Sequence, residues 1–95
     1  MAGYLVAQLQ VTDPDAFEEY RAAVPAVIAR FDGRYLIRGG KIDAKEGAWP
    51  APRLVVLEFP DVQRAHEFYD SPEYQEILPL RLKASTGTVA IVEGI

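Results

Sequence analysis

Apolar and polar residues follow each other along the 95-residue chain in a pattern that predicts four strands and two helical regions. Gly3–Val11 has an apolar residue at every second position, which is typical of a strand with one buried face. Between Asp13 and Gly33, apolar residues recur at helical spacing, with Asp13 as the N-cap and Gly33 supplying the left-handed conformation at the C-terminal end. The other strands are predicted at Arg34–Arg38, Leu54–Phe59 and Thr86–Glu93.

A second helical region is predicted after the third strand. Pro60 ends that strand because proline has no N–H to donate to a neighbouring strand, and Asp61 is placed to cap a helix. Ser71-Pro72 restarts the helix, as a cap followed by the first helical residue. The region is expected to end near Ala84-Ser85, and Pro79 is expected to break it in two.

The order of elements is β-α-β-β-α-β, which predicts an α+β ferredoxin-like fold with residues 1–95 as a single domain. Helices cover one face of its antiparallel four-stranded sheet and leave the other face bare. Side chains alternate between the two faces along a strand, and Glu58 is expected to point away from the helices, so the residues of the bare face can be assigned by counting from Glu58. They are Tyr4, Val6, Gln8, Arg34, Leu36, Arg38, Leu54, Val56, Glu58, Val89, Ile91 and Glu93. This set is too apolar for a solvated face. We therefore expect two sheets to pack face to face in a twofold homodimer, with a cavity between the sheet and the partner subunit.

Composition and charge argue against several classes of partner and cofactor. A net charge of −4 with scattered basic residues argues against nucleic acid as a partner. No apolar run approaches the roughly 20 residues that span a bilayer, so no membrane partner is expected. The first residues lack the pattern of a signal peptide, and a cytoplasmic location is expected. With no cysteine, one histidine and no glycine-rich nucleotide motif, neither a metal site nor a bound cofactor is expected.

Arg38 and Glu58 are the candidates for chemistry that lie on neighbouring strands. Arg38 could anchor a carboxylate or an enolate while Glu58 acts as the catalytic base, or the two could form a buried ion pair that fixes strand register or the dimer. Arg34, Arg53 and Arg81 could join an anion site, because arginine matches planar carboxylates. Each could instead be a surface or interface arginine that pairs with an acidic group.

Aromatic residues supply the remaining candidates. Tyr20, Tyr69 and Tyr74 lie at core-like helical spacing, so each phenol could donate to a ligand in the cavity or bury its ring with the hydroxyl on a backbone partner. Trp49 lies in the irregular Lys41–Pro52 connection, where it could pack on the partner subunit or cap a ligand cavity. His66 lies off the apolar stripe and is expected to be exposed.

Short motifs spread over essentially the whole chain resemble a known family. They are the region of Tyr20, then Gly33-Arg34-Tyr35-Leu36-Ile37-Arg38-Gly39-Gly40, Glu46-Gly47, Trp49, Pro52-Arg53, Glu58-Phe59-Pro60, Tyr69-Asp70-Ser71-Pro72-Glu73-Tyr74, Leu80-Arg81 and Glu93-Gly94. In these motifs the chain resembles the family called domain of unknown function 1330, in the dimeric α/β-barrel superfamily. The resemblance implies a ferredoxin-like fold and a homodimer but no reaction, because the superfamily includes cofactor-independent monooxygenases, haem-degrading enzymes, lactone isomerases and proteins of no known activity.

Two functional hypotheses follow from these residues. The first is a cofactor-independent enzyme that acts on a small organic acid or a ketone/enol, with Arg38 binding the anion and Glu58 moving a proton. The second is a non-catalytic ligand-binding or structural homodimer in which the same residues hold the interface.

Overall fold

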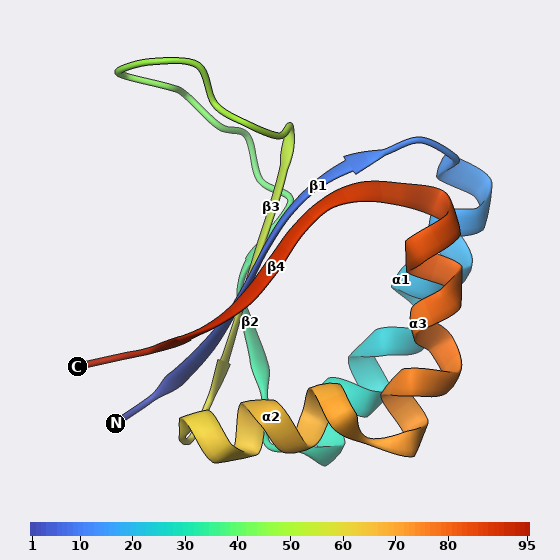
Figure 1. The fold of residues 1–95 in the computed structure, drawn as a ribbon, viewed down its shortest axis with the longest axis vertical. Helices are drawn as coiled ribbons and strands as arrows, with labels where there is room; N and C mark the ends of the chain where they lie inside the picture. Colours follow the sequence, from blue (N-terminus) through green and yellow to red (C-terminus); the bar gives the residue numbers. More distant parts are fainter.

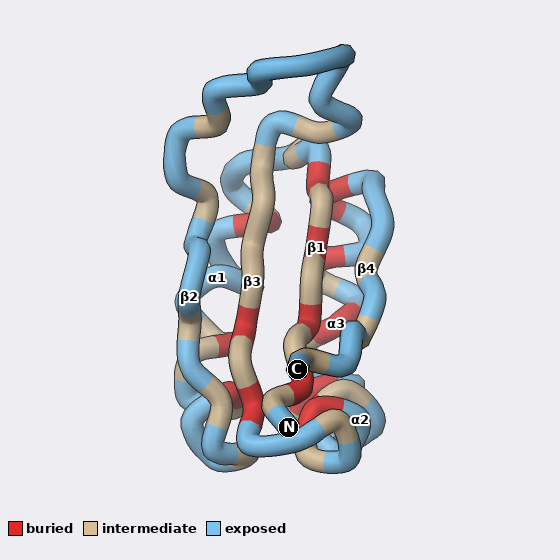
Figure 2. The backbone as a smooth tube through the Cα atoms, turned by 90° about the vertical axis from the view of Figure 1, so that its left-hand side faces the viewer, coloured by how far each residue is buried: buried red, intermediate tan, exposed pale blue.

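A four-stranded sheet with three helices on one face makes up the computed structural model, which describes residues 1–95 (Figure 1). In chain order the elements are β1 (Gly3–Val11), α1 (Pro14–Arg30), β2 (Arg34–Arg38), β3 (Arg53–Phe59), α2 (Val62–Asp70), α3 (Pro72–Ala84) and β4 (Ser85–Glu93). The strand order is β2-β3-β1-β4, and every neighbouring pair is antiparallel (Figure 2). This arrangement confirms the predicted α+β ferredoxin-like fold.

Helix α1 is capped as predicted at its start but not at its end. The Asp13 side chain accepts a hydrogen bond from the Ala16 N–H at 3.2 Å. At the other end Asp32, with a φ of 63°, takes the left-handed conformation that was expected of Gly33. Gly33 is needed for a different reason, because a Cβ there would collide with the Phe59 ring. The glycine therefore permits close packing rather than the turn.

Ser71 joins α2 to α3 through one side chain. Its hydroxyl donates to the Phe68 carbonyl at 2.8 Å and accepts from the Tyr74 N–H at 3.1 Å. The same residue thus ends one helix and caps the next. Asp61 caps α2 by accepting from the Arg64 N–H at 2.7 Å. Both predicted caps are confirmed.

Pro79 does not break the second helical region. Helix α3 runs continuously through it, so the predicted interruption is wrong. A proline in a helix removes the hydrogen bond to the carbonyl four residues earlier, which belongs to Gln75. Both residues are exposed, so water can satisfy that carbonyl.

The core lies between the helices and the helix-facing side of the sheet. Buried residues alternate along β1, where Leu5, Ala7 and Leu9 point towards the helices. Phe59 from β3 and Phe68 from α2 are the largest fully buried side chains, and their ring centroids are 5.2 Å apart. The predicted assignment of faces is therefore confirmed for β1 and β3.

A bulge in β2 reverses the predicted placement of Arg38. The pairing with β3 shifts at Leu36, so that Ile37 lies opposite Val56 and Arg38 opposite Val55. One extra residue moves every later side chain to the other face. Arg38 therefore lies on the helix-covered face, and its predicted position beside Glu58 is wrong.

The predicted faces of β4 are also reversed. Val92 lies opposite Tyr4 on the bare face, whereas Val89 and Ile91 pack against the core. Glu93 lies an even number of residues from both of them, so its side chain is also on the helix-covered side of the sheet and not on the bare face. Apolar residues occupy both odd and even positions of this strand, so alternation alone could not predict which set of side chains faces the core.

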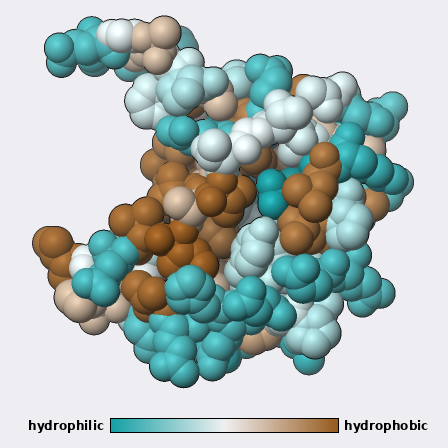
Figure 3. All heavy atoms as spheres, in the orientation of Figure 1, coloured by the Kyte–Doolittle hydropathy of each residue, from teal (hydrophilic) through white to brown (hydrophobic).

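The bare face, as the structure defines it, is apolar at its centre and carries one ion pair. Its side chains include Tyr4, Val6, Gln8, Arg34, Ile37, Leu54, Val56, Glu58, Thr88, Ala90 and Val92. Figure 3 shows apolar atoms gathered on this side, in the hollow between the projecting loop before β3 and the chain termini. The Glu58 carboxylate accepts from Arg34 Nε at 2.7 Å, and Tyr4 Oη lies 3.4 Å from its other oxygen.

None of the three helices has the length and apolar character needed to cross a bilayer.

Candidate functional site

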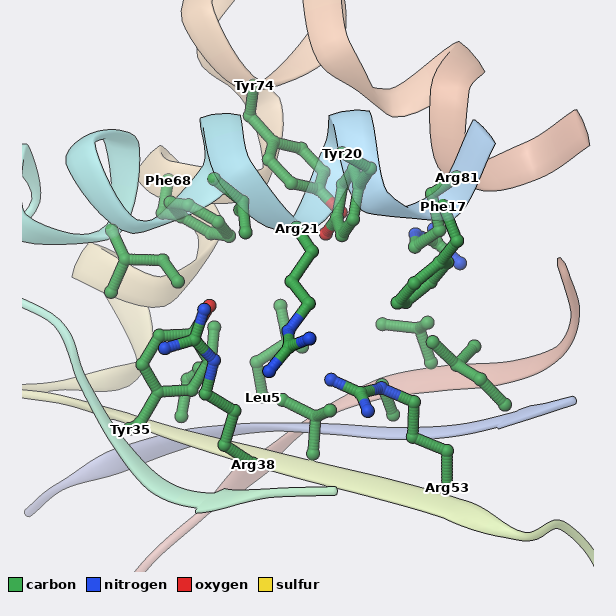
Figure 4. Close-up of a pocket in the computed structure, with 17 residues that line it drawn as sticks. Leu5, Phe17, Tyr20, Arg21, Tyr35, Arg38, Arg53, Phe68, Tyr74 and Arg81 are labelled. Carbon is green, nitrogen blue, oxygen red and sulfur yellow. The ribbon is translucent and has the colours of Figure 1, made fainter. Parts of the chain in front are cut away.

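A cavity lies between the helix-covered face of the sheet and helices α1 and α3 (Figure 4). The space inside it that a water-sized sphere can occupy is about 40 Å³, and 13 of its 17 lining residues are hydrophobic. Cavities of this kind, mostly apolar with a few convergent polar groups, are typical of small-molecule sites. The sequence pattern predicts a cavity on the bare face, against a partner subunit. The cavity described here lies on the opposite face, within one chain.

Three arginines from different elements point into this cavity. They are Arg21 from α1, Arg38 from β2 and Arg53 from β3, and we call them the arginine cluster (Figure 4). The Arg38 guanidinium lies 4.6 Å from the centroid of the Tyr35 ring, and that of Arg53 lies 5.2 Å from the centroid of the Phe17 ring. These aromatic contacts hold two of the three cations against the cavity wall.

The three cations are close enough to act on one another and on Tyr35. Burial lowers the pKa of Arg53, and the charges of Arg21 and Arg38 lower it further. Burial raises the pKa of Tyr35, while Arg38, Arg53 and Arg21 oppose that rise. The arginine cluster thus concentrates positive charge at one place, although the whole chain is acidic.

No carboxylate balances this charge inside the cavity. None of the lining residues is acidic, and neither Arg38 nor Arg53 forms an ion pair. Arg21 has only a 3.5 Å contact with Glu18 on the exposed side of α1. Arg53 Nε is buried without a hydrogen-bond partner. Since unpaired buried donors are costly, the cavity is suited to an anion.

Arg81 adds a fourth cation to the cavity wall. It is only 7% exposed, it forms no ion pair, and its Nε has no hydrogen-bond partner. Arginine is seldom this buried unless it is paired. Its position agrees with the anion-site interpretation of Arg81 and not with the interpretation as a surface residue.

A pair of tyrosines completes the polar groups of the cavity. The hydroxyls of Tyr20 and Tyr74 are 2.8 Å apart, and Tyr74 is 2% exposed. Burial, followed by the charge and hydrogen bond of Tyr74, raises the pKa of Tyr20 well above its ordinary value. The Tyr20 phenol therefore stays protonated and able to donate throughout the physiological pH range.

The raised pKa of Tyr20 makes stability fall in base. Above pH 10, its ordinary pKa, the unfolded chain loses the Tyr20 proton that the folded chain keeps, so unfolding gains a favourable step. We expect the stability advantage of the wild type over Tyr20→Phe to shrink by about 1.4 kcal/mol between pH 8 and pH 11. Urea unfolding at the two pH values measures it. Tyr69→Phe is the matched control, and an advantage that stays constant for Tyr20→Phe would contradict the prediction.

The other predicted site residues lie outside this cavity. Glu58 and Arg34 pair with each other across the sheet from it, so Glu58 cannot serve as its base. The Tyr69 and Tyr74 ring centroids are 5.3 Å apart, but Tyr69 does not line the cavity. Trp49 lines a separate and more open hollow at the projecting loop. His66 is exposed, as expected.

Of the predicted site residues, Arg38, Arg53, Tyr74 and Arg81 come together here, as does Tyr20. Two residues of this cavity are not among the predicted ones, Arg21 and Tyr35. A signal for Arg21 was present, because it lies four residues after Phe17 and so falls on the apolar stripe of α1. Tyr35 lies on the buried side of β2, opposite Leu57.

Solved structures share this fold at low sequence identity. A protein of unknown function from Rhodopseudomonas palustris is 17% identical with a TM-score of 0.73, over 99% of this chain and 82% of that one. A dimeric ferredoxin-like protein of unknown function from Thermobifida fusca is 16% identical with a TM-score of 0.66, over 99% and 92%. SnoaB, a cofactor-independent oxygenase from Streptomyces nogalater, is 15% identical with a TM-score of 0.63, over 99% and 93%. Such identities support the fold alone.

A family model described as Domain of unknown function (DUF1330) matches residues 2–95. No curated protein matches the sequence.

Proposed function

Because the chain belongs to the DUF1330 family, whose name assigns no activity, its cavity is the best guide to its role, and we propose that it binds a small organic acid there. The arginine cluster holds the carboxylate, and the apolar walls hold the body of the ligand. One observation carries the proposal: four arginines line a cavity that no carboxylate side chain lines.

The chemistry of the cavity favours a carboxylic acid over other anions. Guanidinium groups donate parallel hydrogen bonds to planar carboxylates, and several arginines converge here from different elements. An inorganic anion would leave the apolar walls without a partner. An acid with a hydrocarbon body can contact both the arginines and the apolar walls. The narrow space between the walls limits that body to a small hydrocarbon group.

We propose further that two copies pair through their bare faces. Val6 and Val56 lie opposite each other at the centre of that face and are only half-buried in one chain. Burying such a patch against a second copy would remove apolar surface from water. The Thermobifida fusca protein of the same fold is described as dimeric, which supports this proposal. Each subunit then keeps its own ligand cavity on the opposite face.

A second candidate function is a cofactor-independent enzyme that acts on an enolisable ketone or acid. The support is chemical, because fixed cations stabilise an enolate more than its neutral parent. SnoaB, which has the same fold, is described as a cofactor-independent oxygenase. Exchange of ligand α-protons in D₂O, followed by NMR, tests this role. If exchange is no faster with the protein than without it, the enzymatic role is refuted and acid binding is the only proposed function that remains.

The test of acid binding is calorimetric titration with 4-phenylbutanoate and its neutral isostere, 4-phenylbutanamide. Hydrogen bonds to charged groups contribute about 1.5–3 kcal/mol, so the acid should bind at least about tenfold tighter than the amide. Arg38→Gln should remove most of that difference. Arg30→Gln is the matched control, because Arg30 is an arginine that does not line the cavity. Equal affinity for acid and amide would refute the proposal.

Gly39 leaves room for the Arg53 guanidinium. The variant Gly39→Ala therefore tests the site without replacing any arginine. Gly39 has a φ of 72°, and a Cβ there would collide with the Arg53 guanidinium. We expect 4-phenylbutanoate to bind about tenfold more weakly, with a loss of stability of about 1 kcal/mol. Gly40→Ala is the control, since a Cβ at Gly40 meets nothing within 4 Å. Similar affinities for the two variants would contradict this role of Gly39.

A further inference from the structure

We propose that the bound acid carries a second oxygen, one that accepts a hydrogen bond from the Tyr20–Tyr74 pair and another from Arg81 on the helix side of the cavity. The inference rests on the proposed binding of an acid and narrows its class. The ligand would be an oxo acid or a dicarboxylic acid with a small apolar body, rather than a plain hydrocarbon acid.

In Figure 4 the polar groups of the cavity come from the helices on one side and from the sheet on the other, and Arg21 extends from α1 towards Arg38 and Arg53. The Tyr20 and Tyr74 hydroxyls meet on the helix side, and Arg81 reaches the cavity from α3 on that side. Arg38 and Arg53 rise from the sheet opposite them. A ligand whose carboxylate lies at the arginine cluster would therefore present its other end to the tyrosines.

The tyrosine pair has one hydroxyl proton that no protein group accepts. Two hydroxyls carry two protons, and the bond between Tyr20 and Tyr74 uses one of them. Neither hydroxyl has another hydrogen bond within the chain. Since buried polar groups are nearly always satisfied, the second proton points to an acceptor from outside the chain.

Arg81 offers donors to the same region. Its charge acts on Tyr20, where it opposes the rise in pKa that burial causes. Its buried Nε has no partner, and an arginine side chain has no acceptor atom. Tyr20 itself stays protonated because of its raised pKa. The helix side of the cavity therefore has a surplus of donors.

The complementary ligand group is an oxygen that accepts without needing to donate. A ketone carbonyl meets this requirement, and so does a second carboxylate. A plain methylene at the same position would leave the spare proton and Arg81 Nε unsatisfied, at a cost comparable to a lost hydrogen bond.

The test compares 4-phenylbutanoate with three ligands that add an acceptor: 2-oxo-4-phenylbutanoate, 4-oxo-4-phenylbutanoate and 4-(4-carboxyphenyl)butanoate. At least one should bind about tenfold tighter than the parent, and its identity distinguishes an oxo acid from a dicarboxylic acid. In the double variant Tyr20→Phe, Tyr74→Phe, that gain should fall severalfold when each ligand is compared with the parent acid on the same variant. Tyr69→Phe is the matched control and should keep the gain.

The outcomes separate this inference from the proposed function. If the parent acid binds and none of the three gains affinity, or if the gain survives the double variant, the second-oxygen inference is overturned. If the parent acid does not bind, the proposed function fails first. Should the double variant not fold, 4-oxo-4-phenylbutanoate labelled with ¹³C at its ketone tests the wild type. Its carbonyl signal should move downfield on binding, and an upfield movement would refute the hydrogen bond.

Discussion

Replacing Arg81 by methionine is expected to stabilise the fold and, in the same protein, to weaken binding of an acid that carries the second oxygen, such as 4-oxo-4-phenylbutanoate. Arg81 is 7% exposed, unpaired and on the wall of the cavity. A buried cation without a partner opposes folding, and a hydrophobic side chain of similar length removes that cost. We expect the free energy of unfolding to rise by about 1 kcal/mol, or about 4–8 °C in Tm. Affinity for the acid should fall at least about tenfold.

This pairing of opposite effects distinguishes a binding residue from a structural one. Lys83→Met is the matched control, because it removes one positive charge from an exposed position of the same helix. It should change neither Tm nor affinity appreciably. Thermal unfolding and calorimetric titration measure both quantities. An Arg81→Met protein that is less stable than the wild type, and that binds the acid normally, would make Arg81 a structural residue.

Placing a lysine at Val56 is expected to separate the proposed dimer into folded monomers. Val56 lies at the centre of the bare face, opposite Val6 in β1 and Ile37 in β2. Twofold symmetry would bury two new charges near the axis of the interface, each without a partner. We expect dimer dissociation to become at least about 100-fold more favourable, because an unpaired buried charge costs several kcal/mol.

The monomer itself should tolerate Val56→Lys. The side chain is half-buried in one chain and faces away from the core. Sedimentation velocity across a range of concentrations measures the dissociation constant, and circular dichroism checks the fold. Gln63→Lys, on the exposed side of α2, is the control for the added charge. A variant that remains dimeric at the same concentrations as Gln63→Lys would place the interface elsewhere.

The two faces of the sheet have different roles under these proposals. The helix-covered face carries the proposed ligand cavity, and the bare face carries the proposed subunit contact and the ion pair of Arg34 with Glu58. Glu58 then serves the strand pairing and the proposed interface rather than proton transfer in the cavity. Val56→Lys should accordingly leave acid binding within each subunit intact.

Local signals in the sequence were sufficient to predict the order of elements and their caps. Asp13, Asp61 and Ser71 cap helices as expected, because capping depends on a side chain and the backbone within three residues of it. Pro79 misled the prediction because a proline is tolerated where the freed carbonyl faces water, and that depends on which side of the helix is exposed.

The candidate site was harder to predict because it depends on register. One extra residue at Leu36 moves Arg38 from the face of Glu58 to the face of the cavity, and no residue there signals a bulge. The predicted pair therefore joined residues that lie on opposite sides of the sheet. The location of the cavity was equally hidden, because it depends on how α1 and α3 lie over the sheet rather than on any local pattern.

The most direct test of acid binding in the cavity follows the arginine Nε–H signals by NMR during titration with 4-phenylbutanoate. Arg53 Nε and Arg81 Nε are buried and unpartnered, whereas Arg34 Nε already donates to Glu58 at 2.7 Å. We expect the Arg53 signal to shift in proportion to bound ligand while the Arg34 signal stays in place. A shift at Arg34 with none at Arg53 would contradict binding in this cavity and move the ligand to the bare face.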